Sequence, residues 1–154
     1  MAMQGGEKMK AFLTKLSNDL TSGKPAVQVG FLEGSTCGIN NDQPSPTIAF
    51  ILENGAPAAH IPPRPFFRNM ITRRSGKWGR QLAALLKANN YNVKTALDGM
   101  GLVMGEQLQL SITEFTDPGN AESTIRRKGF DKPLEDSKNM KRSVDHQVIL
   151  SGGE

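Results

Sequence analysis

The chain has 154 residues, 37% of them hydrophobic and 22% charged, which fits one domain over residues 1–154 with its own core. Its one cysteine, Cys37, excludes an intrachain disulfide and any site built on several thiolates, and the net charge is +4. There is no signal-peptide core and no apolar run near the roughly 20 residues that span a bilayer, so we expect synthesis in a cytoplasm and no membrane contact.

Two elements are predicted near the N-terminus. Apolar residues at helical spacing predict an amphipathic helix from about Glu7 to Leu20. Strict alternation in AVQVGFL then predicts a strand over Val27–Leu32. The polar stretch that follows, near 34–46, is longer than most connections in compact domains, and we expect a loop insertion there.

The next segment predicts a short helix that starts at Ser45 and stops at Gly55 and Pro57. A helical pattern resumes at Ser75, which suits an N-cap, and continues to about residue 89. The tetrapeptide NNYN at 89–92 interrupts this pattern.

The strongest helical pattern runs from Val93 to Phe115. Gly99, Gly101 and Gly105 each cost such a helix about 1 kcal/mol against alanine. We therefore expect a closely packed neighbour beside them.

The last third is polar and rich in loops. It predicts a loop insertion near 116–136, with a short helix near Ser123–Lys128, and a terminal strand over Ser143–Leu150. This strand should pair with Val27–Leu32, because an isolated strand leaves its backbone groups unpaired. The predicted fold class is α+β: a small antiparallel or mixed sheet covered by two main helices, at 75–89 and 93–115, with long extended loops.

Catalytic chemistry is not indicated. His60 and His146 are the only histidines and have no metal-binding spacing, so we interpret both as structural. The glycine-rich GMGLVMG at 99–105 lies inside a predicted helix and cannot form a phosphate-binding turn. We predict that the protein is not an enzyme and has no catalytic, cofactor-binding or metal-binding residues.

Charge is segregated along the chain. Asn54–Leu97 contains eight basic and no acidic residues, whereas Met1–Glu53 has four basic and five acidic and Asp98–Glu154 has seven basic and ten acidic. A block this one-sided suits phosphate, solvent or an acidic partner surface. Nonspecific DNA contact is one use. Sequence-specific readout is not indicated, because there is no helix-turn-helix or zinc-finger spacing and no aromatic stacking platform.

The stretch HIPPRPFFR, residues 60–68, combines prolines, phenylalanines and arginines. Its prolines hold the chain extended and then start a helix. Phe66 and Phe67 point to different sides of that helix, so one should enter the core and the other should meet a second surface. Arg64 and Arg68 lie four residues apart and can hold carboxylates. The alternative is a rigid turn with solvated arginines.

Three stretches resemble a known family in their order and spacing. They are VGFLEG at 29–34, IAFILENGAPAAHIPPRPFFR at 48–68 and STIRRKGFDKPLEDSKNMKRSV at 123–144. They are similar to the bacteriophage tail completion and neck proteins typified by the HK97 gp10-like family, and the similarity covers most of the chain from Val27 to Val148. One departure is Lys138, which stands where the family usually has a turn glycine.

The resemblance implies a structural virion protein without enzymatic activity. It implies a small α+β fold and a homo-oligomeric ring, typically a hexamer, in the neck at the head-proximal end of the tail. Its partners would be the head–tail connector or head-closure protein and the tail tube or tail terminator protein. The protein would be made in the host cytoplasm and carried in the virion.

Two alternative functions are also consistent with the sequence. The protein could be the tail terminator that caps the tail tube, or, in another class, a basic DNA-binding accessory protein that contacts genomic DNA. Residues predicted to shape the structural motif are Gly55, Pro57, Pro62, Pro63, Pro65, Phe66, Pro133 and Leu134. Residues predicted to contact a neighbouring subunit or connector are Arg64, Phe67, Arg68, Arg73, Arg74, Lys77 and Arg80.

Overall fold

The computed structural model describes residues 4–21, 23–37, 43–117, 119, 122, 125–126, 129 and 138–150. Its elements, in chain order, are α1 (Gln4–Thr21), β1 (Ala26–Phe31), β2 (Thr36–Cys37), β3 (Gln43–Pro44), α2 (Ser45–Asn54), a 3₁₀ turn (Pro57–Ala59), α3 (Phe66–Ala88), α4 (Val93–Glu114), α6 (Lys138–Arg142) and β4 (Val144–Ile149).

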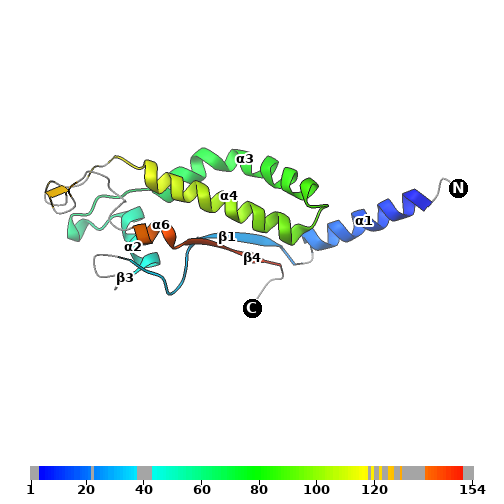
Figure 1. Cartoon of the computed structure of the whole chain (residues 1–154), viewed down its shortest axis with the longest axis horizontal. Coiled ribbons are helices and arrows are strands. Elements are labelled where there is room, and N and C mark those ends of the chain that lie inside the picture. Colours follow the sequence, from blue (N-terminus) through cyan, green and yellow to red (C-terminus); the bar gives the residue numbers. More distant parts are fainter. Residues whose placement is uncertain are drawn as a thin grey trace.

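The body of the molecule is built in layers (Figure 1). Strands β1 and β4 pair antiparallel, with Val29 opposite His146. Helix α4 packs on this sheet, and α3 packs along α4 in the opposite direction. Helix α2, the β2–β3 pair and α6 lie at one end, while α1 extends away from the other end. In the described part of the chain no helix is long and apolar enough to cross a membrane.

The core lies where the first turn of α3 meets α4 and the sheet. Phe66, Leu108 and Ile112 are almost completely buried there. The ring of Phe66 meets that of Phe31 edge to face, with centroids 6.2 Å apart. Burial of each such side chain contributes about 1.5–3 kcal/mol, so these residues fix α3 and α4 on the sheet.

Several sequence predictions are confirmed. The two predicted strands pair with each other, and a long helix starts at Val93 and ends at Glu114. The Asn92 side chain caps it by accepting a hydrogen bond from the Thr95 amide at 3.0 Å. The fold is α+β, although helix predominates.

The glycines of α4 have the expected neighbours. A Cβ at Gly99 would lie 3.3 Å from Leu85 of α3, and one at Gly101 would overlap the His146 ring of β4. Gly105 has more room, since its Cβ would lie 3.8 Å from Val144. The three glycines therefore let α4 pack against both layers, most tightly at Gly101.

Two predictions about α3 are wrong. Ser75 does not cap a helix but lies inside α3, which starts nine residues earlier at Phe66, directly after the prolines that were predicted to start a helix. Buried Phe66 and Met70, four residues apart, anchor this first part, and their packing outweighs the glycine at Gly76. In addition, α3 does not cover the sheet with α4: it packs on α4 and reaches the sheet through Phe66.

The loop predictions are tested only in part. The stretch near 34–46 contains the short β2–β3 pair and the start of α2 rather than loop alone. Residues 38–42 and most of 116–136 lie outside the described residues, and so do Pro133, Leu134 and most of the helix predicted near Ser123–Lys128. Helix α6, at Lys138–Arg142, was not predicted.

Candidate assembly surface

The proline-rich motif begins with a tight turn after α2. Gly55 has a φ of +76°, a region that favours glycine, and its amide donates to the Ile51 carbonyl. A Cβ at this position would lie 2.7 Å from the Pro63 nitrogen and 2.9 Å from the Ile61 oxygen. Only a glycine leaves room for the chain to return so closely past the end of α2.

The returning chain closes a small loop. Ala56 and Ile61 exchange backbone hydrogen bonds of 2.9 and 3.1 Å around the 3₁₀ turn. His60, exposed at the loop, has a left-handed φ of 53°. The Arg64 amide then donates to the Leu52 carbonyl at 2.7 Å, so the segment between α2 and α3 closes on itself and is then held to α2 at Arg64.

Glu53 of α2 caps the N-terminus of α3. Its carboxylate accepts from the amides of Phe67 at 2.9 Å and Arg68 at 3.1 Å. The Arg68 guanidinium donates through Nε to the same carboxylate at 2.9 Å and through Nη2 to the Glu53 carbonyl at 3.0 Å. A carboxylate at this position meets unpaired amides and the positive end of the helix dipole.

The predicted contact residues separate into two groups. Arg64 is buried, and its Nη2 donates to the Gly119 carbonyl at 3.4 Å. Arg68 binds Glu53, and Phe67 packs against the core. These three residues therefore have contacts within the chain, although the Arg68 side chain also remains largely exposed.

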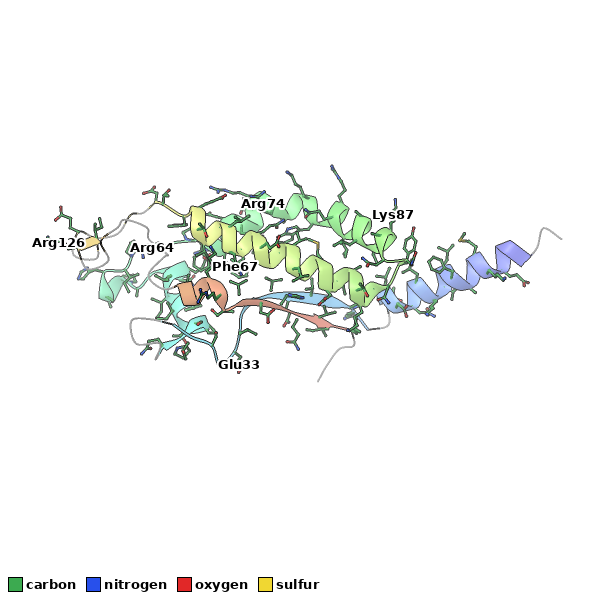
Figure 2. The ribbon with its side chains drawn as sticks, in the orientation of Figure 1. Glu33, Arg64, Phe67, Arg74, Lys87 and Arg126 are labelled. Atoms are coloured by element: carbon green, nitrogen blue, oxygen red, sulfur yellow. The ribbon has the colours of Figure 1, made fainter. Side chains whose placement is uncertain are left out.

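The second group lies along α3. Arg73, Lys77 and Arg80 are exposed. Lys87 is exposed as well; it belongs to the basic block but was not among the residues predicted to contact a partner. None of the four has an ion pair within the part of the chain that the structure describes. Arg74 is half-buried. Arg74 and Lys87 mark two points along α3 in Figure 2.

The sequence indicated the basic block but missed Glu53. The sequence did contain one indication of its importance: Glu53 is the one acid within α2 and lies directly before the turn at Asn54 and Gly55. What could not be read from the sequence is that the turn brings it back to α3. The carboxylate that Arg68 was expected to find on a partner is thus in the same chain.

Large apolar side chains are exposed on three separate elements. On α1, Met9 is 59% exposed and is flanked by exposed Phe12 and Leu13. On α2, Phe50 is 69% exposed, and on α4 Leu102 is 58% exposed. Apolar surface in several places on one small chain suggests contact with other molecules.

Histidine 146 has a structural environment. Its Nε2 lies 2.9 Å from an Asp98 carboxylate oxygen, and its ring packs over Gly101. This joins β4 to α4 and agrees with the structural role predicted for it. Among the described residues no group of three or more histidine, cysteine, aspartate and glutamate side chains could hold a metal ion.

No family model, curated protein or solved structure matches the chain in the comparisons.

Proposed function

We propose that this protein is a structural virion component of a tailed bacteriophage. It forms a ring in the neck, at the head-proximal end of the tail, and joins the tail to the head connector. The observation that carries the proposal is the exposed apolar surface on α1, α2 and α4. A ring subunit has neighbours on two sides and further rings above and below it, so it needs several such surfaces.

The stretch at 48–68 that resembles the tail completion proteins supports the same proposal, because its unusual residues have specific contacts in the fold. Gly55 permits the close return, Arg64 and Phe66 are buried, and Glu53 caps α3. A rigid segment of this kind holds α3 at a fixed angle to α2. The proposed role is structural and requires neither catalysis nor a cofactor.

The test is electron microscopy of particles assembled without this protein, in a phage that encodes it. We expect separate full heads and finished tails, with joining restored when the protein is supplied from a plasmid. Overlong or unstable tails would instead indicate the tail terminator. Normal infectious particles would contradict both neck roles.

A DNA-binding role is the second candidate, favoured by the exposed basic residues of α3. Contact with phosphates would release counterions, so the logarithm of the affinity should fall linearly with the logarithm of salt concentration. If all four exposed side chains touch phosphate, the slope is about −3.6 on duplex DNA. Fluorescence anisotropy with a labelled duplex measures it, and an absence of binding at low salt would remove this candidate.

A further inference from the structure

Helix α4 carries an exposed row of alternating acids and leucines. It consists of Asp98, Leu102, Glu106, Leu110 and Glu114, each four residues after the last, and all five are exposed. Because four residues exceed one helical turn by about 40°, the series turns by about 160° around the helix from Asp98 to Glu114, and its middle three residues lie within about 80° of one another. Leu102 and Leu110 are 58% and 49% exposed, so the row is apolar as well as acidic.

The charges of this row are largely unused within the chain. Asp98 contacts His146, but Glu106 and Glu114 have no ion pair among the described residues. We call these five positions the acidic row.

Helix α3 carries a basic row. Arg73, Lys77, Arg80 and Lys87 follow one another at spacings of four, three and seven residues, which keeps them on one face of a helix. Exposed Ala84 lies on the same face between Arg80 and Lys87. No acid occurs anywhere in α3, so the basic row has no opposite charge on its own helix.

Basic and acidic residues of the two rows lie at similar heights, or levels, along the α3–α4 pair. Trp78 Nε1 donates to Gln107 Oε1 at 2.8 Å, and Leu85 stands beside Gly99. In this antiparallel pair Arg80 is therefore near the level of Glu106. Likewise, Lys87 is near the level of Asp98.

The repeats along the two rows differ in length and in direction of turn. Arg73, Arg80 and Lys87 recur every seven residues, about 10.5 Å along a helix, and the acids recur every eight, about 12 Å. Leu102 is near the level of Ala84, whose small side chain leaves space for it. A seven-residue step turns a helix by about −20° and an eight-residue step by about +80°, so opposite charges face each other at the middle of the two rows, at Arg80 and Glu106, and diverge toward the ends.

We propose that a second copy of this chain packs its basic row against the acidic row, so that Arg80 of one copy meets Glu106 of the other. If the two copies are related by a rotation about an axis parallel to α3 and α4, each residue keeps its height along that axis. Residues of α3 and α4 that lie at the same height in one chain can then face each other between the two copies. A second copy is favoured over an unrelated partner because both complementary rows belong to the same chain. This deepens the assembly part of the proposed function and rests on it only in taking the protein to act as an oligomer.

The test is charge reversal followed by measurement of mass in solution by sedimentation. Arg80→Glu or Glu106→Arg alone should weaken self-association by about tenfold or more, because each places like charges together. The double variant Arg80→Glu/Glu106→Arg should recover most of the loss, since it restores an opposite pair with the signs exchanged. Circular dichroism of each variant checks that it is folded.

Controls and a further variant separate this contact from general charge effects. Arg126→Glu and Glu33→Arg reverse exposed charges that lie away from α3 and α4 (Figure 2) and should leave the mass unchanged. Leu102→Gln should weaken association even at high salt, where the ionic contribution is screened.

The outcomes distinguish the contact from the proposed function. A monomeric wild-type protein, single variants that assemble normally, or a double variant that recovers nothing would each overturn the contact. If the reversals act as expected and the wild-type protein is a dimer in virions as well as in solution, the contact stands and the ring is wrong. A larger closed oligomer supports both.

Discussion

Gly101 is the residue at which α4 and β4 approach most closely. The Cβ of an alanine there would lie 2.5 Å from Cγ and 2.9 Å from Cβ of His146, closer than such atoms pack in real proteins. The ring cannot move freely, because its Nε2 is bound to Asp98 at 2.9 Å. We expect Gly101→Ala to lower the free energy of unfolding by about 1–3 kcal/mol, measured by urea denaturation.

Gly105→Ala is the matched control for this prediction. Both glycines lie in α4 and face β4, but a Cβ at Gly105 would stand 3.8 Å from Val144, an ordinary contact. Alanine also favours the helix by about 1 kcal/mol. Gly105→Ala should therefore be neutral or stabilising, and an equal loss in both variants would show that the His146 contact is not the cause.

Two arginines that look alike in sequence have different surroundings. Arg64 follows a proline and Arg68 follows a phenylalanine in HIPPRPFFR, and both were assigned to a partner surface. Only the return of the chain past Gly55 decides that Arg64 is buried and that Arg68 meets Glu53. Sequence spacing indicated that these arginines can hold carboxylates, but it could not show that the preceding helix supplies one to Arg68.

At the scale of elements, the connection between α2 and α3 depends on Glu53. The Glu53 side chain is 13% exposed and accepts hydrogen bonds from two amides at the start of α3, whereas the Arg68 side chain is 62% exposed. Glu53→Ala should cost about 1–2 kcal/mol, as loss of a helix cap does. Arg68→Ala should cost less than about 1 kcal/mol, because an exposed ion pair contributes little.

Thermal or urea unfolding of both variants measures this difference. Glu33→Ala, at an exposed carboxylate outside any helix, is the control for loss of one negative charge. If Arg68→Ala proved as destabilising as Glu53→Ala, the ion pair rather than the cap would hold the two helices.

Elements with one strong periodicity were predictable, and elements decided by tertiary packing were not. The strands at Ala26–Phe31 and Val144–Ile149 alternate clearly, so their pairing followed from the need to satisfy backbone groups. The continuity of α3 depends on Phe66 and Met70 packing into a core that the sequence does not reveal. The same limit applies to α1, whose helix was predicted but whose projection from the body was not.

At the scale of the whole molecule, segregated charge was evident from sequence, but its pattern on the surface was not. The sequence showed a basic block against acid-rich flanks. Within that block the structure places Arg73, Lys77, Arg80 and Lys87 on one face of α3, and it places the acidic row on the adjacent helix. Neither row could be defined without knowing which sides of α3 and α4 are buried.

Stability should therefore depend on protein concentration. If folded copies associate through these rows and unfolded chains do not, mass action raises the free energy of unfolding by roughly 1 kcal/mol for each tenfold increase in concentration above the dissociation constant. The midpoint of thermal unfolding of the wild-type protein should rise accordingly, while that of Arg80→Glu should be lower and should begin to rise only at concentrations about tenfold higher. Scanning calorimetry over a hundredfold concentration range measures both. A wild-type midpoint that does not change with concentration, in protein shown to unfold reversibly, would mean that the monomer is the stable folded unit and that the two rows meet something other than a second copy.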